Sequence, residues 1–510
     1  MKITFVYRGY QSLGIEYLSA VLKKAGHRTN LVFDPALFDD NYISIKFLNK
    51  LFDYGKKVIN KVIASKPDLI LFSVVSDEYT WACNTAKKIK ELVDIPIIFG
   101  GIHVTSVPEI VIKNDFVDYI IIGEGEYALL DLVNSLENGK LDYTIKNVWF
   151  KKNGRVIKNS LRPLISNLDD LPIPDKELYK NEKLIYCKNG RYYIMTSRGC
   201  PYKCSFCNNS FLKDLYANKG VYLRRRSVDN VIQELKYAKK VYKIKYLVIW
   251  DEIFVYDKKW LRKFSKRYKE EINIPFFCWV HPLNIDEEVV NLLKEANCRE
   301  VEMGIQTIYE KTREDILNRY HSNAQVKRAI HLLKKANIFL SVDSIFGLPK
   351  QTKEEGMDLA RFYNQNRVDR ANVYWLRWHP KTEIVKIAQD IGILSEDEIK
   401  KLEKGEDNRG ACIGGGSFKS EFVEAERLIL LTHLLPKKVI NFLIEKRLCR
   451  FKFLNKMSSH SVVMTNILLM ILDKCFWFSQ RKSYPKVKPW FKYYLFYTIH
   501  KFLDKRSWRL

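Results

Sequence analysis

The first 145 residues alternate short apolar runs with helical patterns, and this alternation constrains the fold more than any other feature of the chain. The apolar runs are Ile3–Tyr7, Arg28–Phe33, Leu69–Val74, Ile95–Phe99 and Tyr119–Ile122. Between the first two, apolar residues recur at helical spacing and stop at Gly26, a natural helix terminator. Continuous apolar strands that alternate with helices form parallel sheets covered on both faces. The sequence therefore predicts a doubly wound, Rossmann-like (flavodoxin-like) α/β domain over residues 1–145.

Two glycine-containing turns follow the fourth and fifth of these strands. The first is GGIHVT, from Gly100 to Thr105, and the second is GEGE, from Gly123 to Glu126. Ligands of parallel sheets bind beyond the carboxyl ends of the strands, where glycine lets the backbone come close to a bulky group. Tight turns alone could explain either pair, but two adjacent strand ends favour a ligand edge. No G-x-G-x-x-G follows the first strand, so the pattern is not that of a dinucleotide site.

Residues 1–145 resemble the cobalamin-binding domain that precedes radical S-adenosylmethionine (SAM) domains, and GGIHVTSVPE and GEGE carry the resemblance. It implies cobalamin contacts from Gly100, Gly101, His103, Thr105, Gly123, Glu124 and Gly125. The family's Asp-x-His-x-x-Gly motif, which places a histidine beneath cobalt, is absent, and Tyr10 and Gln11 occupy the corresponding loop. We therefore expect cobalamin that histidine does not ligate. A vestigial domain that binds nothing is the alternative.

Three cysteines, Cys200, Cys204 and Cys207, lie within eight residues and are the strongest chemical signal in the chain. Ten cysteines in 510 residues are too few for a disulfide scaffold. A structural zinc site generally takes four protein ligands, and no fourth cysteine or histidine follows nearby. Three thiolates can instead hold a [4Fe–4S] cluster and leave one iron open. Cys-x3-Cys-x2-Cys after Arg-Gly is strongly diagnostic of the radical SAM superfamily, whose open iron chelates SAM.

The segments after the cysteines resemble, in order, the strands of that family's partial (β/α)6 barrel. Residues 247–254, 300–307 and 341–349 each read as a strand with polar groups at its end. The resemblance implies SAM contacts from Phe206, Asp251, Glu252, Glu302, Gln306 and Asp343. Reactive groups in such barrels lie at the carboxyl ends of the strands. We expect a linker at 146–185, the barrel at 186–385 and a mostly helical, basic region at 386–510.

The formal net charge of +27 is concentrated near the end of the sequence. Residues 436–510 hold 17 basic and 3 acidic side chains, whereas residues 1–150 hold 17 and 18. Residues 476–508 add twelve aromatic side chains. A packed helical cap, peripheral contact of residues 461–510 with an anionic membrane, and single-stranded nucleic-acid binding all fit this composition. Nucleic acid is the least favoured, because no RNA-binding motif is visible.

The location expected from the sequence is cytoplasmic, with a peripheral position at the inner face of the membrane as the alternative. The first residues, MKITFVY, read as a strand rather than as a secretory signal. The most apolar window, Ser461–Phe478, is interrupted by polar and charged residues and is a poor spanning segment.

The family resemblance implies an enzyme with three cofactors: a [4Fe–4S] cluster, SAM and cobalamin. Its most frequent activity is methylation of an unactivated carbon, here in a lipid-like or secondary-metabolite substrate, with flavodoxin or ferredoxin as electron donor. Radical oxidation or cyclisation, as in relatives resembling the anaerobic porphyrin cyclase, is the alternative reaction. A non-catalytic cobalamin or iron–sulfur sensor is the alternative of another class. RNA thiomethylation is disfavoured, since residues 1–150 contain only Cys83 for a second cluster. No side chain stands out as a general acid or base, and neither the substrate nor the oligomeric state follows from the motifs.

Overall fold

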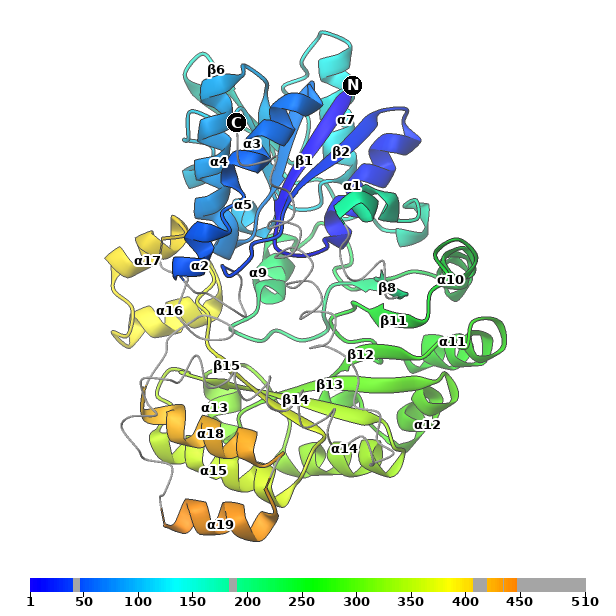
Figure 1. The fold of residues 1–510 in the computed structure, drawn as a ribbon, viewed down its shortest axis with the longest axis vertical. Helices are drawn as coiled ribbons and strands as arrows, with labels where there is room; N and C mark the ends of the chain where they lie inside the picture. Colours follow the sequence, from blue (N-terminus) through cyan, green and yellow to red (C-terminus); the bar gives the residue numbers. More distant parts are fainter. Residues whose placement is uncertain (40–45, 183–189, 407–419, 434, 447–510) are drawn as a thin grey trace.

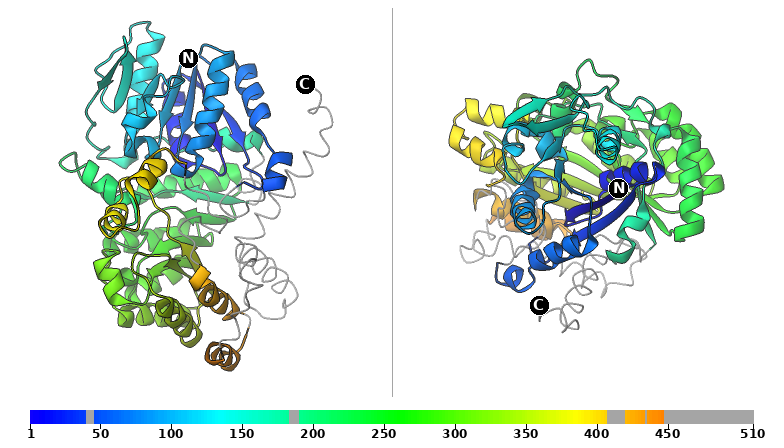
Figure 2. Two further views of the ribbon diagram at one scale, coloured as in Figure 1. Left: turned by 90° about the vertical axis from the view of Figure 1, so that its left-hand side faces the viewer. Right: turned by 90° about the horizontal axis from the view of Figure 1, so that it is seen from above.

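The computed structural model describes two α/β domains stacked one on the other (Figures 1 and 2). The residues described are 1–39, 46–182, 190–406, 420–433 and 435–446. The apolar window at 461–478 and the aromatic, basic segment at 476–508 lie outside them. In the parts of the chain that are described, no helix is both long enough and apolar enough to cross a membrane.

The first domain is built on a seven-stranded sheet with the order β2-β1-β3-β4-β5-β6-β7. Its strands are β1 (Lys2–Arg8), β2 (Arg28–Asp34), β3 (Leu69–Ser73), β4 (Ile97–Gly100), β5 (Tyr119–Ile121), β6 (Val148–Lys152) and β7 (Arg155–Lys158). Strands β1 to β5 are parallel. Their order, 2-1-3-4-5, is that of flavodoxin-like doubly wound sheets. The predicted fold of this domain is confirmed.

Helices cover both faces of this sheet and form two separate apolar cores. The helices are α1 (Leu13–Lys24), α2 (Lys46–Leu51), α3 (Gly55–Ser65), α4 (Tyr79–Leu92), α5 (Ile102–Ser106), α6 (Pro108–Val111) and α7 (Glu126–Glu137), with a 3-10 turn η1 (Ser76–Glu78). One core joins α1 and α7 to residues such as Phe5 of β1. The other joins α3 and α4 to residues such as Phe72 of β3. Alternate residues of one strand therefore serve opposite faces, as the near-continuous apolar runs predicted.

The predicted linker at 146–185 begins too early. Strands β6 and β7 run antiparallel to their neighbours and extend the first sheet beyond β5. The turn between them is Asn153-Gly154, and both residues have positive φ, at 50° and 74°. An Asn-Gly pair with this geometry is a strong hairpin signal. Because Trp149 and Phe150 of β6 are buried in the two cores, this hairpin belongs to the first domain.

Residues 159–182 connect the two domains and include the short 3-10 turns η2 (Leu168–Asp170) and η3 (Lys176–Glu182). Lys176 pairs with the fully buried Glu16 of α1 and donates to the carbonyl oxygen of Tyr193 at 2.8 Å. The connection is thus bonded to both domains.

The second domain is a six-stranded, all-parallel sheet with the order β15-β14-β13-β12-β11-β8. Its strands are β8 (Arg191–Ile194), β11 (Tyr246–Ile249), β12 (Phe276–Val280), β13 (Cys298–Gln306), β14 (Phe339–Phe346) and β15 (Arg370–Trp375). The helices on its outer side are α10 (Val228–Tyr242), α11 (Lys258–Glu271), α12 (Glu287–Glu295), α14 (Asn323–Lys335) and α15 (Lys353–Gln365). Strands β8 and β15 are its two edges, so the barrel is open and the predicted partial (β/α)6 barrel is confirmed.

Short elements complete this domain around its open end. They are β9 (Ser197–Arg198), β10 (Arg224–Arg225), α9 (Asn208–Leu215), η4 (Pro282–Asn284), α13 (Glu310–Asp315), α16 (Glu383–Asp390), α17 (Glu396–Glu403), η5 (Ser420–Phe422), α18 (Val423–Leu431) and α19 (Lys437–Glu445). Helices α18 and α19 pack against α15, and their apolar residues join the main core of the barrel. His433 accepts a hydrogen bond from the backbone N–H of Ala371, on the edge strand β15, at 2.9 Å. Helices α18 and α19 of the predicted helical region thus cover the outer side of one barrel edge.

Candidate active site

The carboxyl ends of β1 to β5 point toward the barrel, so the ligand edge of the first domain faces the second domain (Figure 1). Arg377, which follows β15, forms an ion pair with Asp77, which precedes α4. Thr80 Oγ1 donates to the carbonyl oxygen of Gly405 at 2.8 Å. Tyr10, in the loop after β1, keeps 44% of its surface exposed. The carboxyl ends of the strands of both sheets therefore face one region between the domains.

The three predicted cluster cysteines lie in the loop between β9 and α9. Cys204 is buried, whereas Cys200 and Cys207 are half-buried, and all three are free thiols. Burial raises the pKa of Cys200 to about 11 and that of Cys207 to about 12. Each thiol is therefore protonated at neutral pH, and binding to iron must release its proton.

Arg319 holds this loop and was not found from the sequence. Its Nη1 donates to Cys204 Sγ at 3.3 Å, and its Nη2 donates to the carbonyl oxygen of Gly304 on β13 at 2.7 Å. The backbone N–H of Ser205 donates to Leu317 O at 3.1 Å, next to the same segment. No local spacing signals this contact, because Arg319 and Cys204 are 115 residues apart.

Within the described ranges, no three His, Cys, Asp or Glu side chains converge on one point where an ion could bind. Three thiols that each bind a different iron need not converge. A structural zinc site, by comparison, generally takes four protein ligands around one ion.

Asp251, a predicted SAM contact, has its carboxylate oxygens bonded to other groups of the protein. Its carboxylate accepts hydrogen bonds from the backbone N–H of Thr196 at 2.6 Å and of Ser197 at 3.1 Å, and from both hydroxyl groups. Arg225 pairs with the same carboxylate at 3.2 Å. Asp251 is 2% exposed. In this structure it orders the strand that leads into the cysteine loop.

Glu252, in contrast, presents an exposed side chain beside the cysteines. It hydrogen-bonds with Asn209 and is close enough to Cys200 and Cys207 to interact with them electrostatically. Of the two acids after β11, only Glu252 has a carboxylate open to a ligand, because Asp251 faces the interior. The sequence alone could not separate the two.

A pocket of about 280 Å³ brings together three more of the predicted SAM residues: Phe206, Gln306 and Asp343. Its other lining residues are Ile345, Tyr374, Trp375, Leu376, Arg377 and His379. The amide of Asn372 donates to Asp343 Oδ1 at 2.8 Å and orients that carboxylate. The pocket is bounded by the cysteine loop and the carboxyl ends of β13, β14 and β15, which is where barrels place their ligands.

Glu302 does not line this pocket. It is 6% exposed, and its Oε1 accepts a hydrogen bond from Trp279 Nε1 at 3.3 Å. Gln306 does line it and has φ of +66°, at an irregularity in the pairing of β13 with β14. A non-glycine residue in this conformation is strained, and such strain clusters at ligand sites.

The predicted cobalamin residues of the first glycine turn are mostly engaged inside their own domain. His103 is fully buried, its Nδ1 lies 3.0 Å from Ser76 Oγ, and its ring lies on Tyr79 at 4.2 Å. Burial lowers the pKa of His103 to about 4, so the ring is neutral. A Cβ on Gly101 would lie 2.6 Å from Val74 O, so this glycine is required by chain packing.

The two glycine turns are bonded to each other. Thr105 Oγ1 donates to Gly101 O at 2.9 Å and accepts from the backbone N–H of Gly123 at 2.9 Å. Gly100 and Gly125 have ordinary surroundings, since an added Cβ would meet no atom closer than 3.4 Å. Glu124 pairs with Arg198 and Arg224 of the barrel domain, which leaves it no free carboxylate oxygen. The sequence identified the right edge of the sheet but not the partners of these side chains.

The loop after β1 offers the freest approach to that edge. Gly9 has φ of +93°, and nothing lies within 4 Å of the position of its missing Cβ. Tyr10 packs edge-on against Tyr7 at 5.8 Å and presents its exposed ring beside Gly9. This loop holds no histidine that could ligate cobalt.

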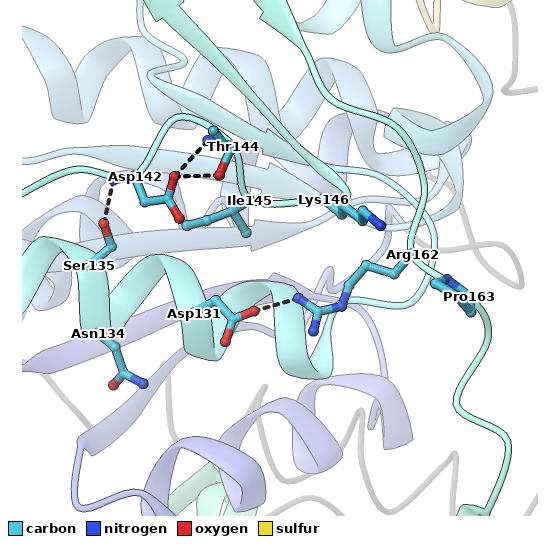
Figure 3. Close-up of a pocket in the computed structure, with 9 residues that line it drawn as sticks. All are labelled: Asp131, Asn134, Ser135, Asp142, Thr144, Ile145, Lys146, Arg162 and Pro163. Carbon is cyan, nitrogen blue, oxygen red and sulfur yellow. Dashed lines mark hydrogen bonds and ion pairs between the residues drawn. The ribbon is translucent and has the colours of Figure 1, made fainter.

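A larger pocket, of about 460 Å³, lies elsewhere in the first domain, between α7 and the segment before β6 (Figure 3). Arg162 pairs with Asp131 across it, and Asp142 accepts hydrogen bonds from Thr144. None of the predicted site residues lines it. It is therefore separate from the region where the two sheet edges meet.

Comparison with known protein families matches both domains. Residues 5–133 match the B12 binding domain, and residues 194–363 match the radical SAM superfamily. The two matched ranges coincide with the parallel part of the first sheet and with β8 to α15 of the barrel.

Curated relatives are similar over most of the chain. An uncharacterized methyltransferase of Pyrococcus horikoshii is 29% identical over 384 residues, which cover 74% of this chain and 78% of the relative. The anaerobic magnesium-protoporphyrin IX monomethyl ester cyclase of Rubrivivax gelatinosus is 28% identical over 406 residues, with 74% and 68% covered.

Solved structures share the fold. The radical SAM methyltransferase TsrM from Kitasatospora setae, solved with tryptophan and a SAM analogue, superposes with a TM-score of 0.62 at 18% identity and covers 76% of each chain. The cobalamin-dependent radical SAM enzyme OxsB, with aqua-cobalamin bound, superposes with a TM-score of 0.63 at 15% identity, covering 93% of this chain and 75% of that one.

The fold and the cysteine loop together define a radical SAM enzyme. The chain belongs to the cobalamin-binding radical SAM enzymes: a B12-binding domain precedes a radical SAM barrel, and the cofactors of these domains are cobalamin, SAM and a [4Fe–4S] cluster.

Proposed function

We propose that this enzyme transfers a methyl group from SAM to an unactivated carbon of a small molecule. The observation that carries the proposal is the meeting of two ligand edges: the open edge of the B12-binding sheet faces the barrel end that bears the cysteine loop and the 280 Å³ pocket. A carbon placed between the edges is in reach of both. Similarity to named methyltransferases supports this reaction.

In this proposal, Cys200, Cys204 and Cys207 hold the cluster. Phe206, Glu252, Gln306 and Asp343 contact SAM, since they line the pocket or lie beside the thiols. Asp251 and Glu302 do not contact SAM directly but hold the chain around the site through hydrogen bonds to other protein groups. Gly9 and Tyr10, with the backbone of Gly100 and Gly125, form the cobalamin edge.

When bound, the cluster supplies the electron that cleaves SAM, and cobalamin supplies a carrier for the methyl group. In balance, one substrate C–H, two SAM and two electrons give the methylated product, S-adenosylhomocysteine, methionine and 5′-deoxyadenosine. The two electrons must come from an external one-electron donor, and we propose flavodoxin or ferredoxin.

The chain's own residues position the reactants and protect them from water. Arg319 restrains Cys204, and the buried bonds of Asp251 restrain the strand before Cys200. His281 stacks on Tyr202 of the cysteine loop at 4.0 Å, and burial lowers the pKa of His281 far below its ordinary value. Because His281 is 2% exposed, its ring excludes water from the side of the loop that carries Tyr202.

Oxidation or cyclisation is the second candidate, because the similarity to the protoporphyrin ester cyclase spans as much of this chain as the similarity to the methyltransferase. The products separate the two reactions. Methyl transfer forms S-adenosylhomocysteine and 5′-deoxyadenosine in equal amounts, whereas oxidation forms 5′-deoxyadenosine without S-adenosylhomocysteine.

We propose a lipid-like or secondary-metabolite substrate on the basis of the basic, aromatic composition of residues 476–508 alone.

The experiment has two parts. The chain is reconstituted without oxygen with iron, sulfide and hydroxocobalamin, and its SAM products are quantified with a chemical reductant. Cells with and without the gene are then fed methionine with a deuterated methyl group, and extracts are searched for a gene-dependent labelled metabolite. Cys204→Ala must lose the cluster and SAM cleavage, while the matched Cys83→Ala, on α4 of the first domain, keeps both. Cleavage by Cys204→Ala would refute the cluster assignment, and cleavage without any S-adenosylhomocysteine would replace methylation by oxidation.

A further inference from the structure

The GEGE turn of the first domain is joined to the strand pair that leads into the cysteine loop. We call Gly123–Glu126 the acid turn, and β9 with β10 the arginine ribbon. Arg198 donates to Glu124 at 3.0 Å and to Glu126 at 2.5 Å. Arg224 donates to both oxygens of Glu124, at 2.9 and 3.0 Å. Two carboxylates of one domain therefore bind two guanidinium groups of the other.

The pairing of the ribbon explains why it needs these carboxylates. Arg198 and Arg224 are direct cross-strand partners in the antiparallel pairing of β9 with β10. Like charges opposite each other destabilise a strand pair, and here the two side chains are only 15% and 6% exposed. Glu124 lies between them and accepts from both. Without the acid turn, two adjacent cations would remain largely buried and unpaired.

The electrostatics agree with a tight, charged junction. Burial by itself would raise the pKa of Glu124, but Arg198 and Arg224 hold it below its ordinary value. Glu126 is 5% exposed. The Glu124 carboxylate is therefore ionised at neutral pH, and its hydrogen bonds with Arg198 and Arg224 are charge-assisted on both sides.

The acid turn also contacts the far end of the cysteine segment. Tyr216 caps α9, the helix that begins directly after Cys207. The backbone N–H of Glu124 donates to the hydroxyl oxygen of Tyr216 at 2.8 Å. A Cβ on Gly123 would lie 1.8 Å from that oxygen, so only glycine permits the contact. Through Arg198 and Tyr216, the first domain is bonded on both sides of the three cysteines.

We propose that Glu124 and Glu126 are positioning residues that set the cysteine loop from the B12-binding domain. In this role they are not cobalamin contacts; they couple the placement of the cluster to the docking of the domain that carries cobalamin. The proposal rests on the proposed function only in taking the three cysteines as cluster ligands.

The test is amide hydrogen exchange on the full chain, first without cofactors. In Glu126→Gln and Glu124→Gln, we expect residues 197–216 to exchange about 10- to 100-fold faster, as expected for loss of a charged hydrogen bond. Strands β1 and β13 should keep wild-type exchange. The matched control is Glu109→Gln, which breaks an exposed pair with Lys158 in the same domain. Glu126→Asp keeps the charge and should fall between wild type and Glu126→Gln.

A second readout is the reduction potential of the reconstituted cluster, measured by titration with electron paramagnetic resonance. Glu126→Gln leaves the cation of Arg198 less neutralised two residues before Cys200, so the potential should rise, and Glu109→Gln should not move it. The variant Glu126→Gln/Arg198→Gln should show a smaller rise than Glu126→Gln alone, because the unpaired cation is gone.

Unchanged exchange in residues 197–216 in both glutamine variants would overturn the proposal. Equal acceleration throughout β1 and β13 would also overturn it, since that is general destabilisation. Because exchange is read without cofactors or turnover, a chain that makes no methylated product but shows the local effect would refute only the proposed function.

Discussion

Asp251→Asn tests whether this carboxylate orders the chain or contacts SAM. Asp251 accepts hydrogen bonds from Thr196 and Ser197 and pairs with Arg225, which is 7% exposed. Arg225 also donates to the carbonyl oxygen of Phe254 at 2.5 Å, but Asp251 is the carboxylate with which it forms an ion pair. The substitution keeps the volume of the side chain and removes the charge.

The cost follows from these contacts. An asparagine offers one acceptor oxygen, and its amide nitrogen would face N–H, O–H or guanidinium donors where the second oxygen now accepts. Removing one partner of a buried ion pair costs about 3–5 kcal/mol, because the other charge stays buried. We expect a loss of this size in the opening free energy of the segment at Thr196 and Ser197. The matched control is Asp229→Asn, whose exposed carboxylate pairs with Lys263 and Arg267, and it should leave the exchange of Thr196 and Ser197 at the wild-type rate.

The assay is amide exchange of Thr196 and Ser197 together with urea unfolding of the full chain. Two domains need not unfold in one step, so local exchange is the primary readout. A double-mutant cycle with Arg225→Met isolates the pair, and Asp251→Asn/Arg225→Met should recover about 0.5–3 kcal/mol relative to additivity. If Asp251→Asn keeps wild-type exchange and unfolding yet loses SAM binding, the ordering role is refuted and Asp251 is a SAM contact.

Three further predictions concern single side chains. Arg319→Gln removes the cationic donor to Cys204 and should make the reduction potential of the cluster more negative. The shift should be about 59 mV for each 1.4 kcal/mol by which the preference for the reduced cluster falls. An unchanged potential in a redox titration would contradict this. Gly123→Ala should destabilise the domain junction by at least about 1–2 kcal/mol, since φ is +71° and the new Cβ would clash with Tyr216. Adding Tyr216→Phe to the same chain should recover part of this loss in thermal unfolding. An equal loss with and without the Tyr216 hydroxyl would contradict the clash. Burial raises the pKa of Glu426 on α18 to about 7, so the folded state holds a proton that the unfolded state releases above about pH 4.5. Stability should therefore fall by about 3 kcal/mol between pH 4.5 and 7, and Glu426→Gln should remove this slope in exchange measured on α18.

Local patterns predicted the fold of the first domain, and the cysteine motif predicted the cluster ligands. Apolar runs of strand length and helical spacing are properties of neighbouring residues, and they predicted the parallel strands of the first sheet, whereas the barrel was expected from the family resemblance. The cysteine spacing is equally local, because the three residues lie within eight positions of one another. The hairpin β6–β7 was missed although its Asn153-Gly154 signal is also local.

The partners of the polar side chains were decided by tertiary structure. Asp251 and Glu252 are adjacent in sequence, yet one faces the interior and the other the cysteines. Glu124 meets Arg198, 74 residues away, and Arg319 meets Cys204 across 115 residues. A carboxylate at a strand end binds whichever cation the fold brings close to it. When the two residues are far apart in the sequence, local spacing does not indicate that they will meet. The motifs therefore indicated the candidate site, and the docking of the two domains determined which groups its polar side chains contact.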